Sequence, residues 1–260
     1  MLLYPLIWMI GASFMSDSEI FQSGMRIIPE TIMLENYSIG WAGLGGVSFA
    51  TFFRNSFIIS GVNVVGNVLS CSLAAYAFAK TNFRFKRFWF AVMLGTMMLP
   101  IHVTLIPTYI IFHRLDWINT FLPLTIPSFF AMNGFFIFMM TQFMRNIPKE
   151  IDQAALIDGA GAFKHYTHII LPISLPAIVT TAIFAFIWSW NDFFTQMIYL
   201  TDTRLFTVSL ALRQFVDATG QSSWGALFAM SALSLIPLFL IFVFLQKYLV
   251  EGITAGSIKG

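Results

Sequence analysis

Charged residues are scarce in this sequence. Lys, Arg, Asp and Glu make up 10% of its 260 residues, whereas hydrophobic residues make up 58%. A water-soluble domain has about 25% charged residues because its surface must be hydrated. So few charges cannot cover a soluble globule that must also bury 30 Phe residues. The composition therefore excludes an ordinary soluble domain and indicates that the lipid bilayer is the solvent for most of the chain.

Several sequence features of other protein classes are also missing. The single cysteine, Cys71, excludes an intrachain disulfide and any cysteine-rich zinc site. The four histidines form no HExxH pattern, and no glycine-rich phosphate loop is present. The net charge of +2, without a run of Lys and Arg, does not favour a nucleic-acid partner. We therefore expect a non-enzymatic protein with no catalytic residue, no metal site and no cofactor of its own.

Long apolar segments indicate the membrane spans. A span needs about 20 largely apolar residues, and five segments satisfy this: 56–79, 88–112, 121–143, 173–200 and 224–250. Segment 2–15 is apolar but short, which leaves a cleaved signal peptide or an incomplete span as interpretations. A signal peptide begins with basic residues, and residues 1–4 include none. We expect a span that lacks its cytoplasmic end.

The sidedness of the basic residues predicts the orientation. With the N-terminus inside, nine of the 14 Lys and Arg residues lie on the cytoplasmic side: Lys80, Arg84, Lys86, Arg87, Arg145, Lys149, Lys164, Lys247 and Lys259. Positive charge is retained on the cytoplasmic side of membrane proteins. The prediction is an all-α membrane protein of one domain, 1–260, with six transmembrane helices, both termini inside and an outside loop at 16–55.

The most informative segment is the polar interruption at 145–172, between the fourth and fifth predicted spans. Pro148 is suited to a helix start, and Glu150 and Asp152 would complement the helix dipole in the first turn. Gly159 can adopt the left-handed conformation that ends a helix. A second short helix is expected from about residue 161 to 168. Two short helices with small residues at the corner present a surface that another protein can approach closely, although an ordinary connector is the simpler interpretation.

The spacing in this loop resembles the "EAA" loop of binding-protein-dependent ABC importers. That pattern is E-A-A, three residues, Gly, nine residues and I-x-L-P. Here it is Gln153-Ala154-Ala155, then Gly159, then Ile169-Ile-Leu-Pro172. The resemblance extends along the chain to Asn55-Ser56, Ala74–Lys80, the paired prolines Pro100 and Pro107, Trp190-Asn-Asp-Phe193 and the tail 252–260. The last two are similar to the carbohydrate-uptake group, and within it to the smaller membrane subunit of maltose importers.

This resemblance implies a type I ABC importer permease fold with a cytoplasmic coupling-helix loop. It also implies the function of a transmembrane permease subunit that takes up a sugar or sugar-like solute in the bacterial inner (plasma) membrane. The implied partners are ABC ATPase subunits, which would hold the ATP and Mg, a second homologous permease subunit in a heterodimer, an extracytoplasmic solute-binding protein and membrane lipid.

The coupling residues implied by the resemblance lie in the loop and include one departure from the family pattern. The family's motif glutamate falls on Gln153, which leaves an ionic role there in doubt because a neutral hydrogen bond is weaker than a charge-assisted one. An ionic contact could move to a neighbouring acid. The full set expected to contact the ATPase is Glu150, Asp152, Gln153, Ala154, Ala155, Asp158, Gly159 and Ala160.

Polar residues within the spans are the candidates for a translocation path. Asn63 and Asn67 lie on one face of the second span, where they either pack helices together or line a hydrated route. Trp190, Asn191 and Asp192 combine an aromatic ring with hydrogen-bonding groups, which suits a carbohydrate. Asp192 could instead reach the lipid headgroups.

Two other functional classes predict features that differ from those of this sequence. An ion-coupled secondary transporter predicts inverted repeats and several intramembrane acids, but no repeat is visible and Asp192 alone qualifies. An intramembrane enzyme needs a nucleophile or metal constellation within the spans, and the sequence has none.

Overall fold

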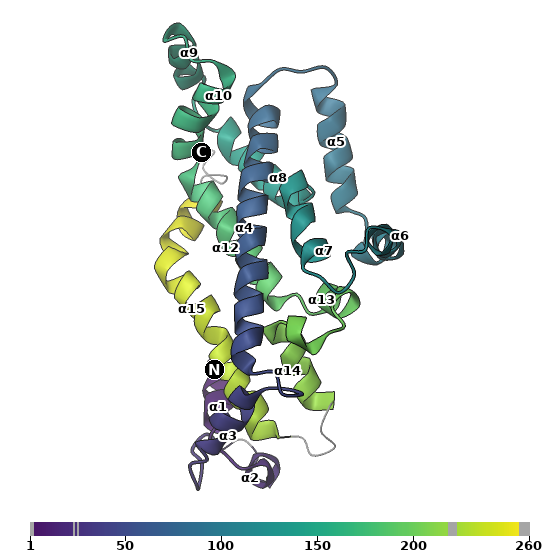
Figure 1. Cartoon of the computed structure of the whole chain (residues 1–260). Coiled ribbons are helices and arrows are strands. Elements are labelled where there is room, and N and C mark those ends of the chain that lie inside the picture. Colours follow the sequence, from purple (N-terminus) through teal and green to yellow (C-terminus); the bar gives the residue numbers. More distant parts are fainter. Residues whose placement is uncertain (1–2, 23, 25, 218–222, 255–260) are drawn as a thin grey trace. The chain divides into compact units, whose positions relative to one another are not determined.

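The computed structural model describes residues 3–22, 24, 26–217 and 223–254. These residues form helices and connecting loops, and within them no β-strand occurs beyond an isolated bridge between Leu44 and Val47. The first half contains α1 (Tyr4–Ala12), α2 (Asp17–Gln22), α3 (Glu35–Ala42), α4 (Phe49–Lys80), α5 (Lys86–Met97), α6 (Ile101–Arg114), α7 (Leu122–Thr125) and η1 (Ile126–Phe130). The second half contains α8 (Gly134–Arg145), α9 (Lys149–Ile157), α10 (Ala162–His165), η2 (Tyr166–Ile170), α11 (Leu171–Ile173), α12 (Leu175–Asn191), α13 (Phe194–Tyr199), η3 (Thr203–Leu205), α14 (Val208–Asp217) and α15 (Trp224–Thr254). Figure 1 shows these elements along the chain.

The helices belong to two compact units. The first comprises residues 1–59, 119–121 and 190–240, and the second comprises residues 60–118, 122–189 and 241–260. The helices α4, α12 and α15 contribute residues to both units. The single permease domain stays a prediction.

The first unit is held together by side chains that bond to distant backbone groups. The buried amide of Asn36 donates to the carbonyl oxygens of Ser13 and Met15, at 3.0 and 2.9 Å. Asn55 donates to the carbonyl oxygens of Arg204 and Phe206, both at 2.9 Å. Loop carbonyls that would otherwise be buried without donors are satisfied in this way.

The second unit has a core built on the C-terminal half of α4. Cys71 and Ala75 are fully buried there against Phe136 and Met140 of α8 and Ile170 of η2. Small residues on α4 let the neighbouring helix backbones approach closely, which is how helices pack when no water drives them together.

The observed helices agree with most predicted spans but differ at their ends. Three helical segments of the described chain are long and apolar enough to cross a membrane: Phe49–Lys80, Leu122–Arg145 and Trp224–Tyr248. Two bent pairs, α5 with α6 and α10–α11 with α12, would raise the number to five if each pair is one span. The predicted span 88–112 is interrupted before Pro100, because a residue that precedes proline disfavours the helical conformation. The predicted span 173–200 breaks between Asn191 and Phe194.

The ends of the chain differ most from the sequence-based expectation. Only the nine residues of α1 are helical within the predicted span 2–15, and α4 begins at Phe49, inside the predicted loop 16–55. Six spans and the inside location of both termini stay predictions. The tail motif at 252–260 lies outside the described residues from 255 onward.

Gly66 marks a close helix contact in the second unit that yields a stability prediction. A Cβ atom at Gly66 would lie 2.0 Å from Oγ and 2.9 Å from Cβ of Ser128. Gly66→Val is therefore expected to destabilise the protein by about 1–3 kcal/mol through overpacking. Thermal inactivation in detergent would measure the loss. Gly61→Val is the matched control, because nothing lies within 4 Å of a Cβ at Gly61. Equal effects of the two substitutions would contradict the prediction.

Candidate functional site: the loop between α8 and α12

The loop at 145–172 begins with α9, and its first turn follows from the sequence. Pro148 precedes the helix with an extended ψ of 139° and has no amide proton to leave unpaired. Glu150 and Asp152 lie in the first turn, where their negative charge is stabilised by the helix dipole. The predicted helix start is therefore observed.

Gly159 ends α9 in the left-handed conformation, with φ of 70°. The amide of Ala160 donates to the carbonyl of Ala155 at 2.9 Å, and the amide of Gly159 donates to the carbonyl of Leu156 at 3.1 Å. This pair of bonds is a Schellman motif, which satisfies carbonyls at the helix end. Asp158, Gly159 and Ala160 thus shape the turn that returns the chain towards α10.

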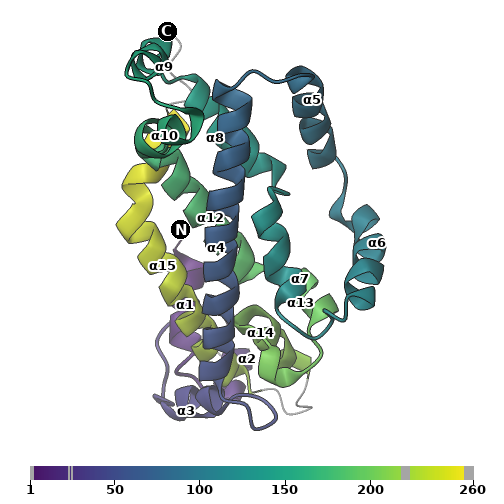
Figure 2. The same cartoon turned by 45° about the horizontal axis from the view of Figure 1, so that its top comes forward.

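The surface of α9 is divided into a buried and an exposed side. Ala155 is 4% exposed, whereas Glu150, Gln153, Ala154 and Asp158 are exposed. The exposed side also carries large apolar residues: Leu156 is 76% exposed, Ile157 is 86% exposed, and Phe163 of α10 is 76% exposed. Figures 1 and 2 both show α9 and α10 beside the end of α4. Exposed apolar side chains on a loop outside the predicted spans indicate a protein contact surface.

Asp152 points inward rather than outward. Its Oδ2 lies 2.8 Å from Nζ of Lys80, the last residue of α4, and its Oδ1 lies 3.2 Å from Nε2 of His165. The Lys80 side chain is 5% exposed, and its ammonium also donates to the carbonyl of Ile147 at 3.1 Å. Of the acids expected to contact the ATPase, Asp152 is therefore engaged within the chain, while Glu150 and Asp158 are exposed.

Two tyrosines connect α4 to the rest of the loop. Tyr76 Oη lies 3.0 Å from the carbonyl oxygen of Ala162 and 3.0 Å from Nδ1 of His165. Tyr166 Oη lies 2.7 Å from Oγ of Ser72, and both residues are buried. Ser72, Tyr76 and Lys80 are four residues apart, so they share one face of α4.

A π-helical turn follows these contacts. Residues Tyr166–Ile170 form the π-helix η2, and the axis bends by 77° between the segments Ala162–Ile173 and Leu175–Asn191. Single π turns concentrate at functional positions of helices. The loop is thus joined to α12 by a bend.

The structure places the predicted path residue Asn63 in contacts between helical segments, whereas Asn67 bonds within α4. The Asn63 amide donates to the carbonyl of Leu124 at 2.9 Å and to Oγ of Ser189 at 3.0 Å. The Asn67 amide donates to the carbonyl of Asn63, and its oxygen accepts from the Cys71 thiol. The Asn63 bonds join α4 to α7 and α12. The Asn67 bonds stay within α4, and a role of either residue in the translocation path stays a prediction.

Trp190, Asn191 and Asp192 lie at the break between α12 and α13. Trp190 is 3% exposed and its ring packs against Phe53 and Phe57, with centroids 5.9 and 4.9 Å away. Asp192 Oδ1 accepts from the Thr195 amide at 3.0 Å in the first turn of α13. Asn191 is exposed. Of the three, Asn191 alone has an exposed side chain, and Asp192, which precedes the N-cap residue Phe193, accepts from a first-turn amide of α13.

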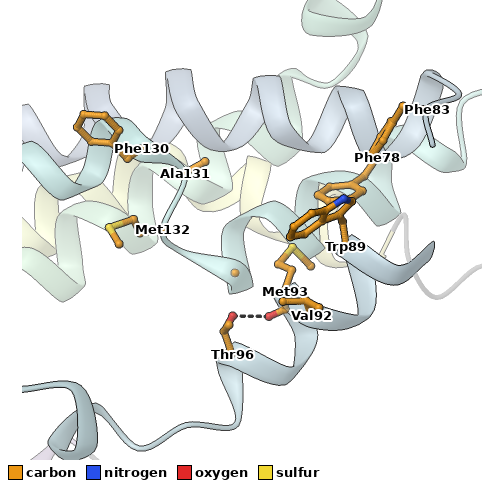
Figure 3. A pocket seen from close by; sticks show the side chains of 10 residues that line it. Phe78, Phe83, Trp89, Val92, Met93, Thr96, Phe130, Ala131 and Met132 are labelled. Carbon is orange, nitrogen blue, oxygen red and sulfur yellow. Dashed lines mark hydrogen bonds between the residues drawn. The ribbon is translucent and has the colours of Figure 1, made fainter. Parts of the chain in front are cut away.

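A pocket of about 590 Å³ lies elsewhere in the second unit (Figure 3). Phe78 of α4, Trp89 and Met93 of α5, and residues 130–132 line it. The lining is largely apolar, and none of the predicted coupling or path residues takes part. The polar side-chain groups in its lining are the Trp89 indole and the Thr96 hydroxyl, which donates to the carbonyl of Met93 at 2.6 Å.

Comparison with known proteins identifies the chain. Residues 66–255 match the family described as "Binding-protein-dependent transport system inner membrane component". The chain belongs to this family. It is 34% identical to the trehalose/maltose transport system permease protein MalG of Thermococcus litoralis, over 99% of this chain and 92% of that protein. It is 31% identical to the sn-glycerol-3-phosphate transport system permease protein UgpE of Rhizobium meliloti, over 96% and 90%.

The fold has a solved counterpart. A chain from a bacterial ABC transporter involved in the import of the acidic polysaccharide alginate superposes with a TM-score of 0.83 at 23% identity, covering 95% of this chain and 90% of that one. The likeness shows the fold of an ABC importer permease. The predicted family and the location as a multi-pass protein of the inner membrane are confirmed. The chain is a permease subunit of an ABC importer and not an ion-coupled secondary transporter.

Sequence reasoning missed the residues that hold the loop in place. In the sequence, Lys80 contributes to the predicted orientation and to the family resemblance, and His165 is one of four histidines without a metal-binding pattern. A usable signal was present, because Ser72, Tyr76 and Lys80 form a polar stripe at four-residue spacing near the end of an apolar helix. The stripe did not reveal its partners, which lie 67 to 94 residues away.

Proposed function

We propose that this chain is the membrane subunit through which a separate ATPase drives uptake of a sugar or sugar-like solute. The observation that carries the proposal is the loop at 145–172, which presents an ordered helix with exposed Leu156 and Ile157 at the predicted cytoplasmic face. The sequence has no phosphate-binding loop, so ATP and Mg would be held by the partner. The chain itself binds no cofactor and catalyses no reaction in this scheme.

The coupling surface would comprise the exposed residues Glu150, Gln153, Ala154 and Asp158 with the apolar tip. Gly159 and Ala160 shape its end, and Ala155 fixes α9 to the protein. Gln153 is exposed and offers an amide where the family pattern has a carboxylate. In this proposal the apolar side chains of Leu156 and Ile157 form the centre of the docking surface, because the buried cores of protein interfaces are apolar and depleted of charged residues.

The substrate class rests on the relatives and on the predicted path. The relatives carry names that specify trehalose/maltose, arabinooligosaccharides and sn-glycerol-3-phosphate. The predicted spans contain no cluster of basic residues, which favours a neutral solute over a strongly anionic one. Within the proposed path, exposed Asn191 is the first candidate for a contact with solute, and the other proposed path residues are Asn63, Asn67, Trp190 and Asp192.

The remaining partners complete an importer. A second, homologous permease subunit would form a heterodimer with this chain, and an extracytoplasmic binding protein would deliver the solute. The proposed topology has six spans with both termini inside, which places 145–172 on the side of the ATPase.

Reconstitution in proteoliposomes tests the proposal. The chain would be assembled with its partner permease, ATPase and binding protein, and uptake of radiolabelled maltose, trehalose and arabinooligosaccharides would be measured. We expect uptake that requires internal ATP and the binding protein and that persists when an ionophore collapses the ion gradients. Uptake without ATP would refute the coupling, and ATP-driven uptake of none of these sugars would refute the substrate class.

A further inference from the structure

The contacts of Asp152 assign a role to an acid that the family pattern did not explain. We infer that Asp152, Lys80 and His165 form a clamp that fixes α9 to the cytoplasmic end of α4, so that displacement of α9 is transmitted to α4. This inference rests on the proposed coupling function and specifies how the movement enters the membrane helices. Asp152 is a positioning residue in this role and not a docking residue.

The Lys80 ammonium contacts two oxygen atoms of the loop. The Lys80 ammonium is 2.8 Å from Asp152 Oδ2 and 3.1 Å from the carbonyl oxygen of Ile147, and its side chain is 5% exposed. A buried ammonium requires an anionic partner, because removing the partner leaves an uncompensated charge out of water. The Lys80–Asp152 pair therefore joins the last residue of α4 to the first turn of α9.

The second carboxylate oxygen extends the clamp to α10. Asp152 Oδ1 lies 3.2 Å from Nε2 of His165, whose side chain is 12% exposed. Neither atom makes an aligned hydrogen bond, and the contact is an ion pair when the imidazole is protonated. On its other side the ring meets the Tyr76 hydroxyl at 3.0 Å. The Asp152 carboxylate thus contacts a side chain of α4 and a side chain of α10.

The polar stripe on α4 makes the attachment stiff. Ser72, Tyr76 and Lys80 each contact the loop, through Tyr166, Ala162 and Asp152 respectively. Three contacts along two turns restrict rotation of the loop about α4 as well as its separation from it. From Lys80, α4 continues without a break to Asn67, about 20 Å away at 1.5 Å per residue.

This arrangement also bears on Gln153. Asp152, the acid next to Gln153, could replace the missing motif glutamate only if its carboxylate were free to contact a basic residue of the ATPase. Asp152 already contacts two cationic or polar partners within the chain, and its side chain is 28% exposed. The exposed side of α9 and its inward carboxylate therefore serve different steps, docking and transmission.

The test measures solute uptake and ATP hydrolysis together in the complete reconstituted importer. For Asp152→Asn and Lys80→Met, we expect the ATPase subunit to copurify within twofold of the wild-type amount. The number of solutes imported per ATP is expected to fall at least fivefold. In the double variant, the number of solutes imported per ATP should be no lower than in the more affected single variant, because the two substitutions remove the same interaction. Asp152→Glu keeps the negative charge, so it should import nearly as many solutes per ATP as the wild type.

Arg84→Met is the matched control, because it removes an exposed cation of the same cytoplasmic loop that stacks only on Phe85. His165→Gln keeps the Lys80–Asp152 pair and is expected to lower uptake per ATP two- to fivefold, which provides a second test if Asp152→Asn fails to accumulate. An unchanged ratio of solutes imported per ATP in Asp152→Asn, Lys80→Met or His165→Gln would overturn the inference, as would loss of ATPase binding with a normal ratio in the remaining complexes. Failure of the wild-type complex to couple uptake to ATP would instead refute the proposed function.

Discussion

Ile157→Asp is expected to abolish ATP-driven uptake while leaving the permease folded. Ile157 is 86% exposed at the end of α9, so the substitution removes almost no contact within the chain. In the proposed complex the new carboxylate would be buried against the ATPase without a partner. Losing an apolar anchor and burying a charge costs at least about 2 kcal/mol, or about thirtyfold in affinity. Copurification of the ATPase subunit and uptake in proteoliposomes measure the effect.

Two variants control for this experiment. Ile157→Val retains an apolar side chain and should retain most of the uptake. Asn82→Asp places the same new charge at an exposed position of the predicted cytoplasmic loop before α5 and should have no effect on ATPase binding. Normal ATPase binding by Ile157→Asp would show that the apolar tip is not the docking surface.

Asn55→Ala is expected to cause the largest loss of stability. Asn55 is 1% exposed, and its amide donates to the carbonyl oxygens of Arg204 and Phe206. Alanine would leave both carbonyls without this donor, at a cost of about 1–3 kcal/mol for each. We expect the midpoint of thermal inactivation in detergent to fall by roughly 4 °C or more. Asn55→Asp should destabilise the protein more than Asn55→Ala does, because it places a carboxylate oxygen against two carbonyl oxygens.

The neighbouring residues provide the comparison. Ser56 Oγ accepts from the Val208 amide at 2.9 Å, at the first residue of α14, so Ser56→Ala should show a smaller loss of about 1 kcal/mol. Arg54 is exposed, and Arg54→Gln should leave stability unchanged. If Asn55→Ala were as stable as Arg54→Gln, the two amide contacts would not contribute to the fold.

Much of the candidate site could be predicted from local sequence. The start of α9 at Pro148 and its end at Gly159 depend on conformational preferences that act within a few residues, and both are observed. The loop spacing and the Trp190–Phe193 segment were sufficient to suggest the family. The family comparison confirms that part of the prediction.

The breaks in the helices were harder to predict. Apolar composition marks a segment as membrane-compatible but does not define where its backbone bends. The interruption before Pro100 has a local cause, the proline itself. The π-helix at Tyr166–Ile170 instead forms where the chain packs against α4, a helix distant in the sequence. Asn63 illustrates the same limit, because the spacing placed it on one face of a helix but did not reveal its hydrogen-bond partners, which lie on Leu124 and Ser189.

By itself the sequence determined that the chain belongs in a membrane, because 10% charged residues cannot hydrate a surface around so much apolar material. The loop spacing added the family. Only the tertiary structure decided what the acids of the loop do. Glu150 and Asp152 lie two residues apart in the first turn of one short helix, and helical geometry turns them to different sides. One faces outward, and the other contacts a lysine 72 residues earlier in the chain. That difference depends on which helix packs beside α9, and a single sequence does not contain this information.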